Sequence, residues 1–482
     1  MSQPALYVGS DQSAWQQLGH FWRERFNEPV STTAGFDDLS SAIGNAGWLF
    51  LDARDEQVAS ALAALVKSQP RTRFPRKTVI LHDGAYPFAV ADTLHLLAAG
   101  RLQVPLIGDE LAEVVTALAT SPEQMGTRQL PEARTLSGRS LQFTSRTPSL
   151  FPVLEQIDRI APHNVTLLLI GETGTGKTTL AHLVHERSPR GDEKFMTVAC
   201  GALPADLIES ELFGHVRGAF TGAERAKVGR FEAAENGTLL LDEIDVLSPR
   251  EQTRLLRVIE TGEFEPVGAT ETRTTNCRLV VAANVDLKGL TEKGQFRSDL
   301  YYRLNVLEFH LPPLRERPLD LIPMAMLFIE EFSRQHHIDV RGIEPEFLDL
   351  VQSYNWPGNI RELKNQIRRA VLFARGGRMS ASELAIRPSS APIVSTASAV
   401  LETPVAANRL SDQVADRERE ILMDALRANN FKRTAAARSL GISRVGLYKK
   451  MRKYGLLSVG HAPARPMGNG LGTPLPATPM TG

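Results

Sequence analysis

The amino-acid sequence predicts an α/β multidomain protein, and three observations support that class. Residues 1–128 alternate short apolar runs with amphipathic stretches, which is typical of βα units on a parallel sheet. Residues 148–317 repeat this alternation, whereas 318–387 show only helical patterning. A Ser-, Ala- and Pro-rich stretch at 388–409 then precedes a compact helical segment at 410–457, which predicts a flexible linker and a small all-α domain.

Composition excludes several classes of protein. A chain of 482 residues suggests roughly three domains. Lysine plus arginine equals aspartate plus glutamate at 55 each, so no overall charge favours nucleic acid or membrane. Cys200 and Cys277 are the only cysteines, which fits a reducing cytosol. The sequence has neither a signal-peptide pattern nor an apolar run of about 20 residues, so we expect a cytoplasmic protein without a membrane partner.

Four apolar runs in the first segment are predicted to be strands: ALYV, GWLFLD, TVILHD and VPLIG. The segments between them are predicted to be helices. A polar connector is expected at 129–147, and the Gly/Pro-rich tail at 458–482 is expected to be disordered.

A phosphate-binding loop is predicted directly after the strand VTLLLI and before a helical segment. Its glycines let backbone amides turn inward, and the helix N-terminus adds a positive dipole end. Lys177 is expected to contact the β- and γ-phosphates, and the Thr178 hydroxyl to bind Mg²⁺. The predicted ATP-binding residues of this loop are Gly171, Glu172, Thr173, Gly174, Thr175, Gly176, Lys177, Thr178 and Thr179.

A second nucleotide motif follows about 65 residues later. The apolar run from Thr238 ends in Asp242 and Glu243, which is the Walker B arrangement. Asp242 is predicted to hold the metal and Glu243 to orient or polarise the attacking water. The pattern is common alone, but with the phosphate loop it predicts an ATPase.

Between these motifs the chain reads ESELFGHVRGAFTGA over 209–223. Here it resembles the bacterial enhancer-binding proteins, AAA+ activators of sigma-54 RNA polymerase. The resemblance implies that a GAFTGA loop contacts the polymerase. The loop residues are Gly218, Ala219, Phe220, Thr221, Gly222 and Ala223. Glycines on both sides of a Phe-Thr pair also favour a mobile, exposed tip, and the alternative is a tight turn with a buried phenylalanine.

The resemblance extends to an AAA+ α/β core over 148–317 and a helical lid over 318–387. It implies that Arg297 and Arg303, in FRSDLYYRLNV, reach the nucleotide of a neighbouring subunit in a ring, as expected of a hexamer. The alternative is a structural salt bridge to Asp299 or Glu308. It also implies that two further residues contact the nucleotide in cis, namely Asn284 and Arg361.

One position departs from the family. The family usually has Asn-Cys where this chain has Ala199-Cys200. The family's asparagine pairs with the Walker B glutamate and couples nucleotide state to the loop. Its absence leaves Glu243 without that partner and puts the strength of ATP hydrolysis in question.

The segment NFKRTAAARSLGISRVGLYKKMRKYGLL predicts a helix-turn-helix, with Gly441 at the turn. It resembles Fis-type domains, which bind enhancer DNA as dimers on paired half-sites. A solvated amphipathic hairpin is the alternative. The predicted DNA contacts are Arg438, Ser443, Arg444, Tyr448, Lys449 and Lys450.

The first segment resembles a degenerate receiver, a (βα)5 domain. Asp52 ends the predicted strand GWLFLD, which corresponds to the third strand of a receiver, where a phosphoacceptor would lie, but only Asp11 supplies a nearby acid. Leu106-Ile107 stands where Lys-Pro is expected, so we predict a structural rather than a phosphorylated Asp52.

The chain is also similar to FleQ-like and VpsR-like activators, which respond to cyclic di-GMP and govern flagellar or exopolysaccharide genes. Arg139, in RSL, and the ExxxR pair Glu330 and Arg334 are the candidate effector residues. The alternative for that pair is an ordinary surface pair at i,i+4.

The sequence therefore predicts a sigma-54-dependent activator: an ATP-driven, Mg²⁺-dependent homo-oligomer, dimer to hexamer, that binds double-stranded enhancer DNA and remodels RNA polymerase. A ligand-sensing DNA-binding regulator with little hydrolysis is the main alternative. A helicase-loading AAA+ protein is a weaker one, because it would not need GAFTGA.

Overall fold

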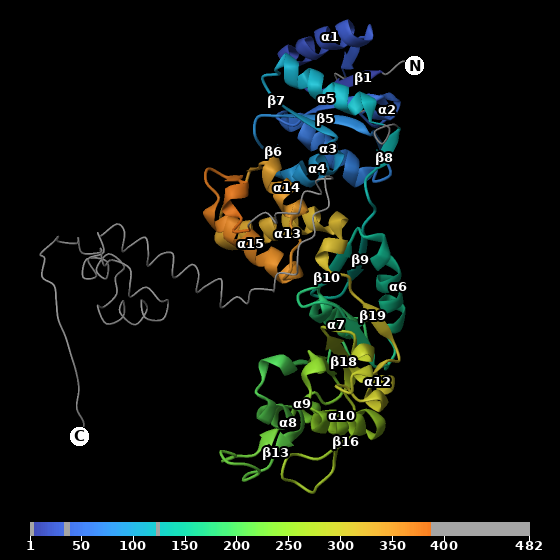
Figure 1. Ribbon diagram of the computed structural model, residues 1–482, viewed down its shortest axis with the longest axis vertical. Coiled ribbons are helices and arrows are strands. Elements are labelled where there is room, and N and C mark those ends of the chain that lie inside the picture. Colours follow the sequence, from blue (N-terminus) through green and yellow to red (C-terminus); the bar gives the residue numbers. More distant parts are fainter. Residues whose placement is uncertain (1–3, 33–38, 122–125, 387–482) are drawn as a thin grey trace, which may run out of the picture. The chain divides into compact units, whose positions relative to one another are not determined.

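The computed structural model describes residues 4–32, 39–121 and 126–386, and these confirm an α/β P-loop architecture with a helical lid (Figure 1). The predicted helix-turn-helix lies outside the described residues. Among the described helices, none is both long and apolar enough to cross a membrane.

The N-terminal segment is a doubly wound parallel sheet in the order β2-β1-β3-β5-β7. Its inner strands are buried along their whole length. One face packs against α1 (Gln12–Phe26) and α5 (Gly108–Thr120). The other face is covered by α2 (Leu39–Asn45), α3 (Glu56–Ser68) and α4 (Ala91–Leu97). The strands are β1 (Ala5–Val8), β2 (Val30–Thr32), β3 (Trp48–Asp52), β5 (Lys77–His82) and β7 (Gly100–Gln103).

The two edge strands differ from the prediction. VPLIG is not a strand: β7 is the preceding GRLQ, and VPLIG leads from it into α5. Only Leu102 of β7 is fully buried, so this edge strand has no apolar run by which to recognise it. The strand β2 is three residues long with Val30 alone buried, and it was not predicted.

The connector at 129–147 is more ordered than predicted. It contains an antiparallel hairpin of β9 (Arg134–Ser137) and β10 (Gln142–Ser145). Leu136 and Phe143 from this hairpin are buried in the core of the segment that follows. Upstream of the hairpin, β8 (Thr127–Gln129) pairs with β4 (Arg73–Pro75).

The central segment is a second parallel sheet, ordered β12-β15-β18-β11-β19. One face packs on α6 (Phe151–Ile160) and α7 (Lys177–Glu186). The other packs on α8 (Ala205–Phe213), α10 (Pro249–Thr261) and α12 (Ser298–Leu304). The strands are β11 (Leu167–Ile170), β12 (Phe195–Ala199), β15 (Thr238–Asp242), β18 (Arg278–Ala283) and β19 (Glu308–His310). Because all five run parallel, the predicted motif residues meet at one edge of the sheet.

The lid consists of α13 (Pro318–His336), α14 (Pro345–Ser353) and α15 (Asn359–Phe373). The prediction that the lid is wholly helical is wrong, because the lid also contains two short strands, β20 (Gly342–Ile343) and β21 (Arg378–Met379). The strand β20 pairs antiparallel with β6 (Tyr86–Pro87) of the N-terminal segment. Apolar residues of the two segments form one buried cluster, and Arg101 binds both carboxylate oxygens of Asp349 at 2.5 and 2.8 Å.

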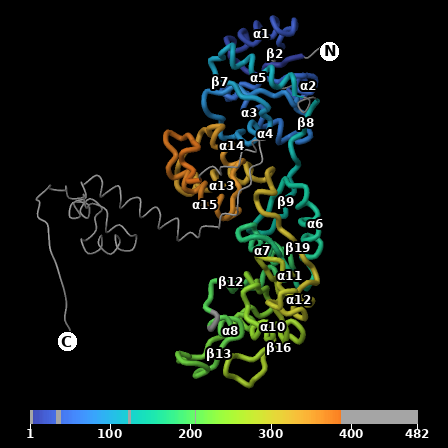
Figure 2. Tube along the Cα trace, in the orientation of Figure 1, coloured from blue at the N-terminus to red at the C-terminus, as the bar shows by residue number. Residues whose placement is uncertain are grey.

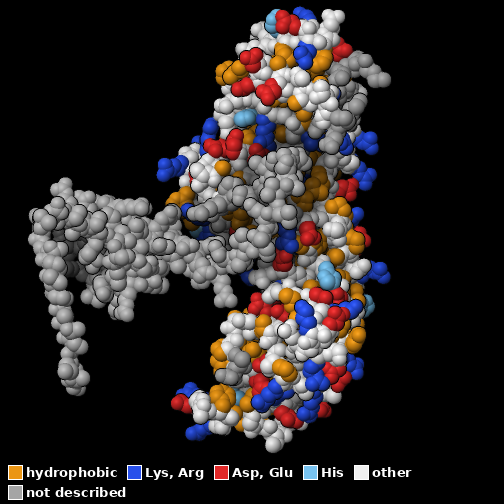
Figure 3. Space-filling model, in the orientation of Figure 1, with side chains coloured by type: hydrophobic (Ala, Val, Ile, Leu, Met, Phe, Trp, Pro, Cys, Tyr) orange, Lys and Arg blue, Asp and Glu red, His pale blue; other side chains and the backbone are white. Residues whose placement is uncertain are grey.

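Acidic and basic side chains are interspersed on the face drawn in Figure 3. This distribution agrees with the zero formal net charge of the chain.

Candidate functional site

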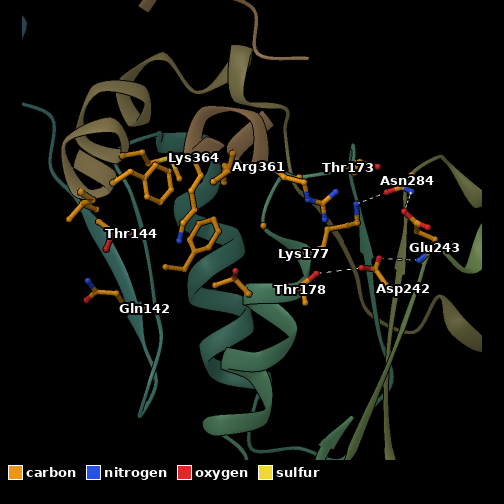
Figure 4. A pocket seen from close by; sticks show the side chains of 18 residues that line it. Gln142, Thr144, Thr173, Lys177, Thr178, Asp242, Glu243, Asn284, Arg361 and Lys364 are labelled. Carbon is orange, nitrogen blue, oxygen red and sulfur yellow. Dashed lines mark hydrogen bonds between the residues drawn. The ribbon is translucent and has the colours of Figure 1, made fainter. Parts of the chain in front are cut away.

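A cavity of about 430 Å³ lies where the carboxyl ends of the central strands meet the lid (Figure 4). It is of the size that small-molecule sites have. The predicted residues that line it are Thr173, Gly174, Gly176, Lys177, Thr178, Thr179, Asp242, Glu243, Asn284 and Arg361. The structure therefore brings together residues that lie up to 188 positions apart in the chain, Thr173 to Arg361.

Lys177 begins α7 and points back into its own loop. Its ammonium donates to the carbonyls of Gly171 (2.6 Å) and Glu172 (3.0 Å) and to Asn284 Oδ1 (2.8 Å). Burial lowers the pKa of Lys177, although neighbouring carboxylates oppose the shift. The three donors of the lysine are thus satisfied inside the protein and are available for exchange to an anionic ligand.

Asp242 is the last residue of β15 and Glu243 follows it, at the end of the strand as predicted. Asp242 lies beside Thr178, whose hydroxyl donates to Oδ2 at 3.4 Å. Burial raises the pKa of Asp242, Glu243 adds to the rise, and Lys177 opposes it. Glu243 adopts a positive φ of 59°, an uncommon conformation for a residue with a side chain. A hydroxyl and a carboxylate side by side are a hard-oxygen donor set that suits Mg²⁺.

Glu172 does not line the cavity. Its carboxylate accepts two hydrogen bonds from Arg315 (2.7 and 2.9 Å) and one from Asn359 Nδ2 (3.1 Å). Hydrogen bonds from Arg315 lower the pKa of Glu172. The amide of Asn359 also donates to Thr173 O (3.0 Å) and accepts from the Leu314 N–H (2.7 Å). Asn359 is fully buried, so the lid holds the phosphate loop through a desolvated contact.

A glycine is required where the lid meets this loop. Gly174 has a φ of +81°, and a Cβ there would come within 2.5 Å of Gly358 O. In addition, the Ile360 N–H donates to Gly174 O at 2.9 Å. The turn of the lid therefore packs directly on the loop backbone.

Sequence reasoning missed the apolar end of the cavity. Side chains from the connector hairpin and the lid supply it: Phe143, Met324, Leu327, Phe328 and Ile360. They come from positions with no nucleotide motif, so no local signal marks them. An apolar end opposite cationic and acidic groups suits a ligand with a flat base and a phosphate chain.

The GAFTGA residues form the tip of a hairpin whose strands are β13 (Gly214–His215) and β14 (Lys227–Val228). Phe220 is 38% exposed, although its ring lies 5.0 Å from that of His215. Thr221 is also exposed. A second hairpin, β16 (Glu263–Phe264) with β17 (Arg273–Thr274), lies beside the first (Figure 2). Val267 in its loop forms an isolated β-bridge with His215 of the first hairpin. The geometry favours the exposed tip over the buried turn.

Arg297 and Arg303 do not line the cavity of their own chain. Arg297 pairs with Asp299 (2.7 Å), whereas Arg303 pairs with Glu260 (3.0 Å) and not with the predicted Glu308. Both arginine side chains are more than 40% exposed, and each has an acidic partner that it can leave.

An arginine side chain of the same segment lies in the acidic site of the N-terminal segment. Asp52 is buried, and Arg54 donates to it from Nε (2.9 Å) and from a terminal nitrogen (2.7 Å). Arg54 also binds Asp11 (2.7 Å), and the Tyr7 hydroxyl donates to Asp52 (3.0 Å). These contacts support the structural interpretation of Asp52. The residue that follows β7 is Val104, so no lysine stands there either.

No described contact brings Arg139 together with the predicted effector pair Glu330 and Arg334. Arg139 pairs with Asp192, and its backbone N–H donates to Glu186. Arg334 pairs with Glu330 at 3.4 Å, as the surface alternative predicted. Glu330 lines a second cavity of about 560 Å³, between α13, the connector hairpin and the start of α4. The predicted DNA contacts between 438 and 450 lie outside the described residues.

Comparisons with known proteins match this organisation. The model of the Sigma-54 interaction domain matches residues 143–310, an AAA+ ATPase lid domain matches 315–393, and the Fis family of bacterial regulatory proteins matches 413–454. The regulatory protein AtoC of Escherichia coli is 38% identical over 78% of this chain and 78% of its own length. FlbD of Caulobacter vibrioides is 36% identical over 82% and 84%. A crystal structure of NtrX from Brucella abortus in complex with ATP is 23% identical, with a TM-score of 0.48, and covers 94% of this chain and all of that one.

Proposed function

This chain belongs to the sigma-54-dependent transcription activators, and from that premise we propose that it is a ring-forming ATPase whose GAFTGA hairpin remodels RNA polymerase at enhancer-controlled promoters. The observation that carries the proposal is the convergence of Lys177, Thr178, Asp242 and Glu243 on one cavity.

A short path leads from this cavity to the hairpin. The strand β12 ends at Ala199, and the next turn (Cys200–Ala202) passes against the Glu243 side chain. The chain then enters α8 and continues directly into β13. Glu243 therefore contacts the segment that leads, through α8, into the hairpin that carries Phe220 and Thr221. This connection is what a machine that moves a loop with ATP requires.

The residues of the site suit phosphoryl transfer to water. Lys177 would turn a donor from the loop carbonyls to the phosphates, and Glu243 would orient the attacking water. Thr178 and Asp242 would hold Mg²⁺, which supplies charge neutralisation at the phosphates. Arg297 and Arg303 would neutralise charge on the nucleotide of a neighbouring subunit, which supports a ring, a hexamer in the family it resembles.

The test is transcription in vitro from a sigma-54 promoter with wild type and Thr221→Ala. We expect ATP-dependent activation by wild type and a loss of about tenfold or more in the variant, about 1.4 kcal/mol of coupling. ATP hydrolysis by the variant should stay within about twofold, because Thr221 does not line the cavity. Thr120→Ala, an exposed threonine at the end of α5, is the matched control. Equal activation by wild type and Thr221→Ala would refute the proposal.

A second candidate is a DNA-binding regulator that binds nucleotide and hydrolyses little of it. Ala199 favours it, because its methyl group gives Glu243 no hydrogen bond. Steady-state ATPase measurements distinguish the two: turnover that does not rise with enhancer DNA and protein concentration would favour this candidate.

We also propose cyclic di-GMP as the effector, acting on exopolysaccharide, biofilm or flagellar genes. Its support in the described residues is that Glu330 and Arg146 both line the second cavity. Arg139 and Arg334, which already have acidic partners, would have to exchange them for the ligand. Calorimetry that shows no binding at micromolar concentration would remove this part of the proposal.

A further inference from the structure

Two carboxylates of the N-terminal segment meet at the carboxyl edge of its sheet. Asp52 is the last residue of β3, and Asp11 lies three residues after the end of β1. The two strands are parallel neighbours, with Val8 in register with Leu51, so they end at the same edge. In the receivers that this segment resembles, carboxylates at this edge hold Mg²⁺, which prefers oxygen ligands. The resemblance therefore implies a cation site here, and the contacts of the four carboxylate oxygens decide whether a metal fits.

All four of these oxygens already accept hydrogen bonds from the protein. Asp52 accepts four: from the Arg54 backbone N–H (3.1 Å), its Nε (2.9 Å) and a terminal nitrogen (2.7 Å), and from the Tyr7 hydroxyl (3.0 Å). Four is about the number of lone-pair sites that a carboxylate offers. The same terminal nitrogen of Arg54 also donates to Asp11 Oδ2 at 2.7 Å, and Asp11 Oδ1 caps α1. A single guanidinium thus bridges the two carboxylates, as a divalent cation would.

The surroundings hold Asp52 and Arg54 in this arrangement. The Asp52 side chain is only 2% exposed, so an oxygen that gave up a hydrogen bond to the protein would not gain one to solvent. Hydrogen bonds to Asp52 and then to Asp11 raise the pKa of Arg54, so its guanidinium stays charged at physiological pH. A Cβ at Gly9 would come within 2.6 Å of the Tyr7 hydroxyl and 2.7 Å of Asp52 Cβ, so the backbone packs closely there. An added metal ion would meet a fixed positive charge and no free oxygen of Asp52.

We propose that Arg54 takes the place of the divalent cation of a receiver, so that the N-terminal segment binds no Mg²⁺ and accepts no phosphoryl group at Asp52. Phosphoryl transfer needs a carboxylate oxygen whose lone pair can attack phosphorus while the donor's leaving group departs. Both oxygens of Asp52 are engaged by Arg54. The charge balance of this acidic edge is therefore built into the chain and does not change with Mg²⁺ or a phosphodonor.

Removal of the guanidinium tests whether it stands where a cation would bind. In Arg54→Ala the oxygens that faced Arg54 are freed, and Asp11 and Asp52 become an oxygen pair of the kind that binds Mg²⁺. In the full-length, nucleotide-free protein, hydrogen exchange of peptides that cover 48–58 reports on this edge. We expect millimolar Mg²⁺ to slow this exchange by about fivefold or more in Arg54→Ala and by less than about twofold in wild type.

Two control variants locate the effect. Arg23→Ala removes an exposed arginine from α1 of the same segment, and it should respond to Mg²⁺ as wild type does. Asp11→Asn added to Arg54→Ala removes one charge from the pair, while the amide oxygen can still cap α1. This double variant should lose the response to Mg²⁺.

A second measurement needs no change at Arg54. Incubation of wild type with acetyl phosphate and Mg²⁺ should add no phosphoryl group, as measured by the intact mass of the protein. Asp52→Asn is the reference that lacks the acceptor carboxylate.

Protection of wild-type peptides 48–58 by Mg²⁺ of about fivefold or more would overturn the inference, because a metal would then displace Arg54. So would a phosphoryl mass increase in wild type that is absent from Asp52→Asn. A folded Arg54→Ala that does not respond to Mg²⁺ would overturn it as well, since the guanidinium would then not stand in for a cation. Should Arg54→Ala fail to fold, the two measurements on wild type still decide the question.

Discussion

Replacing Asn359 tests whether the lid holds the phosphate loop. Its fully buried amide makes three hydrogen bonds, to Glu172, to the Thr173 carbonyl and from the Leu314 N–H. Its φ of 51° lies in the left-handed region, which asparagine tolerates better than alanine does. Asn359→Ala therefore removes the bonds and adds backbone strain.

The magnitude follows from these parts. Leaving a buried N–H without a partner costs about 1–3 kcal/mol, and the two donated bonds add about 1 kcal/mol. Left-handed alanine adds roughly 1 kcal/mol. The sum is about 3–5 kcal/mol against the closed arrangement of lid and loop. Asn359→Gly should destabilise the closed arrangement less than Asn359→Ala does, by a difference of about 1 kcal/mol at most, because glycine relieves the backbone strain.

Native-state hydrogen exchange of peptides that cover 171–176 and 359–363 measures this directly. Local opening should become easier in Asn359→Ala, with exchange faster by about 10²-fold or more, and the ATP Kd should rise in parallel. Asn276→Ala, in which an exposed amide is lost, is the matched control. Exchange within about threefold of wild type, or an alanine variant more protected than the glycine variant, would refute the reasoning.

Three further predictions concern the other sites. Arg54→Ala should destabilise the N-terminal segment by about 2–3 kcal/mol in chemical unfolding, because it leaves the buried Asp52 without its cation; an unchanged midpoint would contradict this. Arg54 also holds the pKa of Asp11 below its ordinary 3.8, so the stabilisation from this pair is present above about pH 4 and is lost as the pH falls through the pKa of Asp11 in the folded protein. When the free energy of unfolding is measured against pH, Arg54→Ala should therefore lose less stability toward acid pH than wild type does. Gly174→Ala should abolish measurable ATP binding at micromolar nucleotide, since its Cβ meets Gly358 O, and normal affinity would show that the lid yields there.

Local motifs predicted the parts of the site that consecutive residues define. The phosphate loop and the Asp242–Glu243 pair each lie at the end of a strand, and parallel strands bring their ends together whatever the loop lengths. The exposed Phe220 was also predictable, because flanking glycines favour a turn.

Contacts between distant segments left no such signal. Arg315 lies 143 positions from Glu172, and nothing in either neighbourhood predicts their pairing. The edge strands β2 and β7 are short and each bury a single residue, so their apolar patterns are too weak to locate them. Arg54 could have been identified, because it stands two residues after Asp52, close enough for its guanidinium to pair with that carboxylate.

The apolar cluster shared by the N-terminal segment and the lid affects how the chain is made. Leu97 belongs to the N-terminal part of that cluster and Leu321 to the lid part, with roughly two hundred residues between them. At about 5–20 residues per second, a ribosome needs roughly 10–40 s to synthesise the intervening sheet. During that time the nascent N-terminal segment has an apolar face whose partner does not yet exist. We therefore expect this protein to depend on chaperone binding during synthesis, and to do so less when the lid is supplied in advance as a separate folded fragment.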